Sequence, residues 1–177
     1  MTVLDIVSTE RAVFYRERLK GEAGAKLPEA YIFETGTNRW RTFDAWPPKG
    51  TTAKALYLHE KGGLSFDPPK ADSGFDAYRS DPARPVPFIE RKATDRTTDY
   101  MIQDQRFASR RPDVLVYESA PLTEDVTIAG PVKPSFWVST SGTDQDWVVK
   151  LVDVYPDDAS EKAAPTGTGP LRPGESM

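Results

Sequence analysis

Residues 131–157 read PVKPSFWVSTSGTDQDWVVKLVDVYPD, and this segment decides the fold class. Two runs within it, residues 135–140 and 147–155, are rich in β-branched and aromatic residues. Such residues favour extended chain that packs on a half-buried sheet. Between the runs, Gly142 and Asp144 favour a tight turn. The segment therefore predicts two strands of a packed β-domain, joined by an acidic turn.

Further short strands are predicted on the N-terminal side of this segment. Residues 29–35 and 39–43 are rich in β-forming residues, and the Gly-Thr-Asn sequence at 36–38 tolerates the positive φ angles of a hairpin turn. Trp46-Pro47-Pro48 stops the second run, because proline cannot donate to a sheet ladder. The other predicted strands cover residues 55–58, 64–66, 113–118 and 126–129. Short strands at this spacing predict a β-sandwich.

One helix is predicted, at residues 8–20, with Ser8 as its N-cap and Gly21 just after its end. Its apolar residues recur at helical spacing: Ala12, Tyr15 and Leu19. Small and polar residues at 21–26 follow, and beyond them the apolar period changes from helical to alternating. This change predicts a domain boundary near residue 26.

The charge balance excludes several classes of protein. The chain has 23 basic and 27 acidic residues, without the basic stripe of a nucleic-acid-binding protein. Arg106, Arg110 and Arg111 form a short broken run, which we interpret as solvated turn residues. Cysteine is absent, so neither a disulfide nor a thiolate metal site can form. We expect no signal peptide at residues 1–7 and no membrane-spanning segment, and the sequence leaves the compartment open.

The order of these motifs resembles the C-terminal region of the cocaine-esterase-like (CocE/NonD) hydrolases. This group includes X-Pro dipeptidyl-peptidases, α-amino-acid ester hydrolases and glutaryl-cephalosporin acylases. The resemblance covers residues 10–158, and residues 38–40 (NRW) and 141–144 (SGTD) place it nearest the ester hydrolase and acylase branch. The matching pieces are residues 14–21 (FYRERLKG), 33–41 (FETGTNRWR), 46–48 (WPP), 56–58 (LYL), 81–87 (DPARPVP), 111–115 (RPDVL), 121–125 (PLTED) and 131–157.

The resemblance implies a mainly β chain, with a jelly-roll-like (galactose-binding-domain-like) sandwich preceded by one helix. Members of the family carry a Ser-Asp-His triad on an α/β-hydrolase domain, which a helical cap covers. By resemblance, residues 1–26 are the terminal helix and linker of the hydrolase domain, and residues 27–158 are the jelly roll. Residues 159–177 are then a loop or disordered tail. We therefore expect an incomplete jelly roll, whose partners are the hydrolase and cap domains and, in the whole enzyme, a second copy.

No catalytic group is predicted in the chain itself. The nearest string to the G-x-S-x-G nucleophile elbow is Gly63-Leu64-Ser65-Phe66-Asp67, which lacks the second glycine. His59 is the only histidine, and it follows an apolar strand, where a structural role is the simpler interpretation. We therefore expect no catalytic residue here, and a chain that is inert alone.

Acidic residues near the C-terminal strands raise the question of a calcium site, because Ca²⁺ prefers oxygen ligands. The candidates are Asp144, Asp146, Asp153, Asp157 and Asp158. No twelve-residue calcium loop is present, so Asp144 and Asp146 are better explained as turn residues. Glu124 and Asp125 are interpreted as polar residues at the entry to a strand. We expect no metal and no cofactor.

The aromatic residues allow a sugar-stacking platform or a packed core, and packing between short strands is the simpler prediction. They are Trp40, Trp46, Phe136, Trp137, Trp147 and Tyr155. Phe88 and Ile89 follow a proline-rich turn in the long segment 67–96. By resemblance, this loop borders the mouth of the active site and supplies part of its wall.

The resemblance thus implies the non-catalytic C-terminal portion of a serine hydrolase that cleaves esters or amides, of dipeptidyl-peptidase or acylase type. Two alternatives stay open: a free-standing β-sandwich that binds a ligand or carbohydrate, and an inactive interaction subunit. Because strands and a helix face would lack their partners, we also expect a low, non-cooperative melt or association of the isolated chain.

Overall fold

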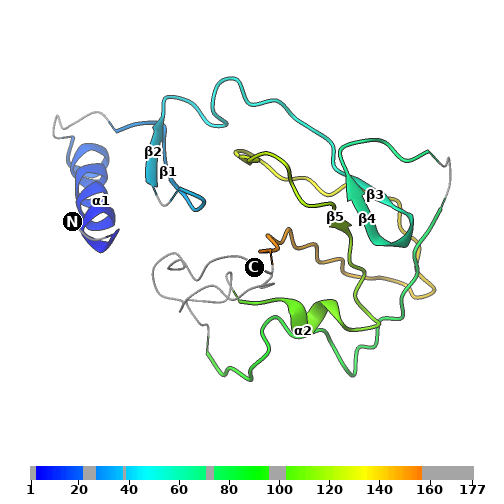
Figure 1. Ribbon diagram of the computed structural model, residues 1–177. Helices are drawn as coiled ribbons and strands as arrows, with labels where there is room; N and C mark the ends of the chain where they lie inside the picture. The colour runs from blue at the N-terminus through cyan, green and yellow to red at the C-terminus, as the bar shows by residue number, and fades with distance from the viewer. Residues whose placement is uncertain (1–2, 22–26, 38, 71–73, 96–102, 157–177) are drawn as a thin grey trace. The chain divides into compact units, whose positions relative to one another are not determined.

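The computed structural model describes residues 3–21, 27–37, 39–70, 74–95 and 103–156 (Figure 1). The chain divides into two compact units. Unit 1 comprises residues 1–51 and 129–131, and unit 2 comprises residues 52–128 and 132–177. Among the described residues, no helix is both long enough and apolar enough to cross a membrane.

Unit 1 begins with helix α1, which runs from Val3 to Lys20. The predicted helix is confirmed, but it starts earlier than residue 8, so Ser8 lies within it and is not its N-cap. Gly21 has a φ angle of +64°, the left-handed conformation that ends many helices and that glycine adopts without strain. The predicted C-terminal end of the helix is therefore correct.

Strands β1 (Ala30–Glu34) and β2 (Arg39–Phe43) form an antiparallel hairpin in which Ala30 lies opposite Phe43. One face of the hairpin is aromatic. The ring of Trp40 stacks on Tyr31 at a centroid distance of 4.7 Å and lies 5.4 Å from the ring of Phe33. These cross-strand pairs stabilise the hairpin, as the sequence predicted.

A shallow groove of about 260 Å³ lies between α1 and the start of β1. Its walls are mostly aromatic and apolar, with one guanidinium at the rim: Phe14, Tyr15, Leu27, Pro28, Tyr31 and Arg11. The ring of Phe14 meets that of Tyr15 edge to face on the helix surface. Both of these helix rings remain largely exposed.

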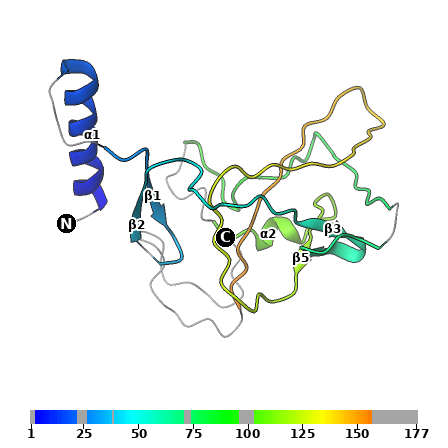
Figure 2. The same ribbon diagram turned by 90° about the horizontal axis from the view of Figure 1, so that it is seen from above.

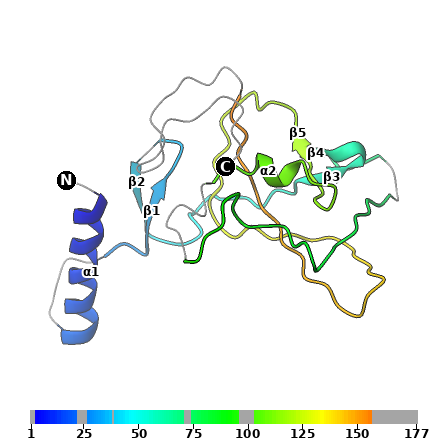
Figure 3. The same ribbon diagram turned by 90° about the horizontal axis from the view of Figure 1, so that it is seen from below.

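Unit 2 contains a three-stranded sheet with strand order β3–β4–β5 (Figure 3). Strand β3 (Tyr57–His59) pairs antiparallel with β4 (Gly63–Ser65), across the short 3-10 turn η1 (Glu60–Gly62). Strand β5 (Glu118–Ser119) pairs parallel with β4. The predicted pair of strands at this point in the chain is confirmed.

The turn between β3 and β4 depends on glycine. Lys61 and Gly62 both have positive φ angles, of 61° and 76°. A Cβ atom at position 62 would lie 2.8 Å from the carbonyl oxygen of Val116, closer than side chains pack. The absence of a side chain therefore lets the segment before β5 approach the turn closely.

The strands predicted after β4 form only in part. Of residues 113–118, only the last enters a ladder, and residues 126–129, 135–140 and 147–155 run without pairing apart from a single bridging residue, Val154 (Figure 2). A local sequence pattern shows that a residue suits a strand, but a ladder also needs a distant segment in register. These individual strand predictions were therefore wrong.

Burial is slight among residues 11–21 and the described residues after them, where the one buried side chain is that of Ala108. Ala108 lies on α2 (Arg106–Ser109), a short helix that the sequence analysis did not predict. Apolar side chains along the unpaired segments are exposed, including Ile128, Val132, Val148 and Leu151. A large apolar surface is thus left without cover within the described residues.

Candidate functional site

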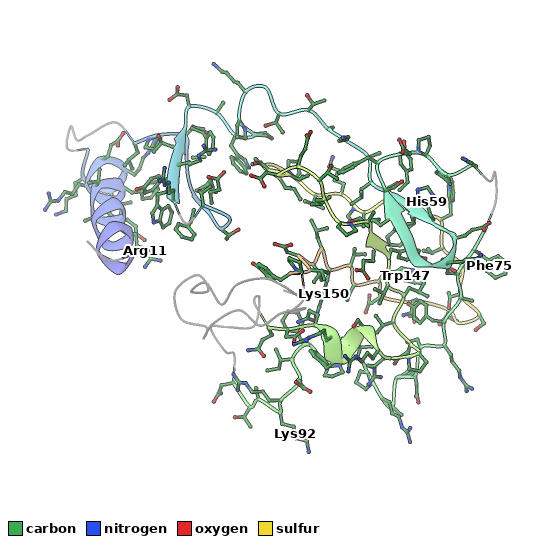
Figure 4. The ribbon with its side chains drawn as sticks, viewed as in Figure 1. Arg11, His59, Phe75, Lys92, Trp147 and Lys150 are labelled. Carbon is green, nitrogen blue, oxygen red and sulfur yellow. The ribbon has the colours of Figure 1, made fainter. Side chains whose placement is uncertain are left out.

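His59 and Ser65, the two residues considered for catalysis, are in contact across the β3–β4 hairpin. His59 is labelled in Figure 4, at the end of β3. The Nε2 atom of His59 lies 2.8 Å from the hydroxyl of Ser65 and 3.0 Å from the carbonyl oxygen of Asp67. The Ser65 hydroxyl donates to the same carbonyl at 3.1 Å and accepts from the amide of Asp67 at 3.2 Å. A serine and a histidine are therefore in contact, as in a catalytic dyad.

The contacts of this pair belong to a turn that follows β4. His59 Nε2 and the Ser65 hydroxyl both lie within hydrogen-bond distance of the Asp67 carbonyl oxygen, and the hydroxyl also accepts from the Asp67 amide. In a catalytic dyad, Nε2 accepts the proton of the serine. Here both side chains are directed to the backbone of Asp67, which is what a turn-closing pair does.

Arg111 connects the proline-rich loop, residues 81–95, to the segment before β5. Its guanidinium makes a two-pronged ion pair with Asp113, with N–O distances of 2.8 and 2.6 Å, and it donates at 3.0 Å to the carbonyl oxygen of Arg84. The hydrogen bond from Arg111 lowers the pKa of Asp113. The expectation that the basic run is merely solvated was wrong for Arg111, and also for Arg106, which pairs with Asp104.

The same loop begins with a hydrogen-bonded turn at Asp81. The Asp81 carboxylate accepts from the amide of Ala83 at 3.0 Å, and its carbonyl accepts from the amide of Arg84 at 2.9 Å. The turn therefore presents the Arg84 carbonyl in a fixed position to Arg111.

Phe88, which the sequence analysis singled out in this loop, lies beside Lys150. The ammonium of Lys150 is 4.3 Å from the centre of the Phe88 ring and donates at 2.6 Å to the side-chain oxygen of Gln105. Gln105 is the residue before α2. The structure thus joins three segments that are far apart in the sequence. Sequence reasoning missed Lys150 and Gln105, because neither belongs to a motif.

A second long-range contact involves Tyr117, whose hydroxyl donates at 2.5 Å to the carboxylate of Asp76. Loss of water around the phenol, together with this bond to a carboxylate, raises the pKa of Tyr117 to about 12. The contact ties residues 74–80 to the strand region before β5. Neither residue had been singled out from the sequence.

The acidic candidates do not gather into an ion site where the structure describes them. Within that part of the chain, no three His, Asp or Glu side chains are close enough to hold a metal ion. Thr140 accepts from the amide of Gly142 at 3.1 Å, so a hydroxyl shapes the turn between residues 140 and 147. Asp157 and Asp158 lie outside the described residues.

The aromatic residues expected to fill a core divide into two groups. Trp40, Trp147 and Tyr155 are half-buried. Trp46, Phe136 and Trp137 are exposed, and Trp137 is fully so. Core packing was therefore the wrong prediction for the second group, because the sheet that would cover them does not form in the described residues.

Comparison with known proteins identifies the family. A family model described as the X-Pro dipeptidyl-peptidase C-terminal non-catalytic domain matches residues 23–176. The cocaine esterase of Rhodococcus sp. is 34% identical over 161 residues, which are 85% of this chain and 28% of the esterase. The chain therefore spans less than a third of the length of this relative.

Two solved structures are also similar. A selenomethionine-labelled α-amino acid ester hydrolase matches with a TM-score of 0.68 and 36% identity, covering 93% of this chain and 32% of the hydrolase. An aminopeptidase from a marine sediment Thaumarchaeota archaeon matches with a TM-score of 0.53 and 38% identity, covering 64% of this chain and 19% of the aminopeptidase. These matches confirm the predicted resemblance and the predicted mainly β, sandwich-type fold class. The chain belongs to the family of X-Pro dipeptidyl-peptidase C-terminal domains, the non-catalytic β-domains of serine hydrolases.

Proposed function

We propose that this chain works as the non-catalytic domain of a serine hydrolase that cleaves esters or amides, of dipeptidyl-peptidase or acylase type. The family match over residues 23–176 carries this proposal. The surroundings of His59 and Ser65 support it, because both side chains lie within hydrogen-bond distance of the Asp67 carbonyl oxygen and residues 63–67 lack the second glycine of a nucleophile elbow. The nucleophile and its base would come from an α/β-hydrolase domain, through an acyl-enzyme intermediate.

The part proposed for this domain is to wall the active site and to support assembly with the hydrolase and cap domains. Residues 81–95 would supply the wall, with Phe88 and Ile89 at its apolar surface. The contacts of Arg111 and Lys150 support this role, because they hold a loop that has no helix or strand of its own. Exposed apolar side chains on unit 2 would meet the other domains.

We propose the same division of the chain as the sequence predicted. Residues 1–26 would then belong to the hydrolase domain, residues 27–158 to the β-domain and residues 159–177 to a tail. A second copy of the whole enzyme is a further proposed partner, which light scattering of that enzyme would test.

A chimera tests the proposed function. The matched segment of the Rhodococcus cocaine esterase is replaced by this chain, and hydrolysis of an activated ester is measured. We expect an active chimera and, for the 177-residue chain alone, no labelling by a fluorophosphonate. Labelling of the folded chain at Ser65, lost in Ser65→Ala, would show that the chain has a catalytic serine of its own.

Ligand binding is the second candidate, and the exposure of Trp137 favours it. An aromatic ring open to solvent can stack on a sugar or another flat apolar ligand. Titration with oligosaccharides, followed by tryptophan fluorescence, would detect such binding. A saturable change in fluorescence that Trp137→Ala abolishes would support ligand binding at Trp137. An unchanged fluorescence signal would exclude binding of these oligosaccharides there.

A further inference from the structure

We propose that Lys150 is a positioning residue that fixes the proline-rich loop, residues 81–95, by joining Phe88 to the start of α2 (Figure 4). The inference concerns a contact that the family assignment does not supply. Its consequence for catalysis rests on the proposed function, but the contact itself can be tested in the isolated chain.

Lys150 makes two different contacts with one ammonium group. It donates to the Gln105 side-chain oxygen at 2.6 Å, and it lies over the Phe88 ring at 4.3 Å. The Gln105 amide nitrogen donates at 2.7 Å to the carbonyl of Gln103, which orients the oxygen toward Lys150. The hydrogen-bonded ammonium can thus attract the electron-rich face of the ring.

The surroundings of the ammonium are consistent with a held position. The residue as a whole is exposed, but the ring and the amide displace part of the water around its charge. This partial burial lowers the pKa of Lys150. A lysine that merely extended into solvent would keep its hydration and many conformations.

The contact between Lys150 and Phe88 restricts the loop because it holds the far end of the proline-containing segment. Arg111 holds the carbonyl of Arg84 at 3.0 Å, just before Pro85, and Lys150 holds Phe88, just after Pro87. The proline rings restrict φ in the chain between these two points. A stiff segment that is held at both ends behaves as a rigid wall, whereas release of one end would let it swing.

Trypsin cleavage of the 177-residue chain tests the contact, since Arg91 and Lys92 follow Phe88 closely. Lys150→Met keeps the length of the side chain and removes its charge. We expect cleavage after Arg91 and Lys92 to become about fivefold to tenfold faster, the size of one lost hydrogen bond with a cation–π contact. Lys150→Arg should restore most of the resistance.

Phe88→Leu tests the same contact from the loop and guards against an unfolded Lys150 variant. It should accelerate cleavage as well, and the double variant should be no faster than the faster single one, because both remove one interaction. Lys54→Met is the matched control. Its ammonium lies 4.0 Å from the ring of Phe66, a residue outside the loop 81–95, and its loss should leave the cleavage rate unchanged.

Unchanged cleavage in Lys150→Met or Phe88→Leu, in chains with the parent circular dichroism spectrum, would overturn the proposal. Independent effects of the two substitutions would overturn it as well.

In the active chimera, Lys150→Met should raise KM several-fold with a smaller change in kcat, and Lys150→Arg should return both values toward those of the parent. An inactive unsubstituted chimera would count against the proposed function alone, since the cleavage rates decide the positioning role separately.

Discussion

The β1–β2 hairpin and residues 126–152, most of which belong to unit 2, have similar sequence patterns but different structures. Both contain runs of β-branched and aromatic residues. The hairpin pairs in full register, with a short turn between its strands. Residues 126–152 form no ladder, and many of their apolar side chains are exposed. The two strands of the hairpin are neighbours in the sequence and pair with each other. We infer that residues 126–152 instead need a pairing segment that is distant in the sequence or belongs to another domain.

A strand pair formed by neighbouring residues differs energetically from one that needs a distant segment. Closing a short loop costs little conformational entropy, so a hairpin with aromatic cross-strand pairs can form by itself. The sheet of β3, β4 and β5 combines both cases. β3 and β4 are neighbours in the sequence, whereas β5 follows β4 by more than fifty residues. The proposed hydrolase partner would supply the cover that residues 126–152 lack.

The largest effect should come from Gly62, where a local turn and a distant segment meet. Gly62→Ala places a side chain at a φ angle of +76° and 2.8 Å from the Val116 carbonyl oxygen. We expect the free energy of opening the β3–β4 turn, measured by hydrogen exchange of its backbone amides, to fall by about 2 to 3 kcal/mol, because the backbone must move away.

Gly74→Ala is the control for this substitution, since nothing lies within 4 Å of the added atom. It should change the free energy of opening the β3–β4 turn, from the same hydrogen exchange, by less than about 0.5 kcal/mol. Equal effects of the two substitutions would mean that the close approach of residue 116 to the turn is absent in solution.

Trp40 tests the local side of the comparison. Trp40→Leu removes the stacking on Tyr31 and Phe33 and should destabilise the hairpin by about 1 to 2 kcal/mol. Trp40→Phe should cost clearly less, because it keeps a ring and removes an indole N–H that is buried without a hydrogen-bond partner. Hydrogen exchange of the β1–β2 backbone amides measures both losses. A larger loss in Trp40→Phe would show that the indole N–H is bonded in solution.

Tyr117 should give a smaller effect, confined to alkaline pH. Its raised pKa means that the folded chain favours the neutral phenol, so this stabilisation is complete below pH 10 and is lost as the pH rises toward about 12. Tyr117→Phe should remove that step from a plot of the urea midpoint against pH. The phenolate absorbance of the variant should lack the component that titrates near pH 12, and an unchanged titration would contradict the contact with Asp76.

Asp113 should give the smallest effect, on the acid side. Its pKa lies below the ordinary 3.8 because of the hydrogen bond from Arg111, so its contribution is present above that value and disappears as the pH falls through the lower, folded pKa. Asp113→Asn should therefore lower the urea midpoint at neutral pH, and the two curves should converge in acid. If the two plots of urea midpoint against pH ran parallel over the whole pH range, the ion pair between Arg111 and Asp113 would not form in the folded chain.

The sequence predicted those parts of the molecule whose partners are close in the chain. The helix end at Gly21, the β1–β2 hairpin and the β3–β4 pair all follow from local residue choice. The loop contacts of Lys150 with Gln105, and of Tyr117 with Asp76, join residues 45 and 41 positions apart and carry no local signal. The serine and histidine were found by residue type, but only the structure shows that both side chains approach the backbone of Asp67.

Thermal unfolding of the isolated chain, combined with sedimentation, tests the comparison most directly. If residues 126–152 need a distant partner, the melt should be broad and begin at low temperature, and the chain should associate through its exposed apolar side chains. A sharp two-state melt of a monomer would contradict this account, because it would require these residues to be packed within the chain itself.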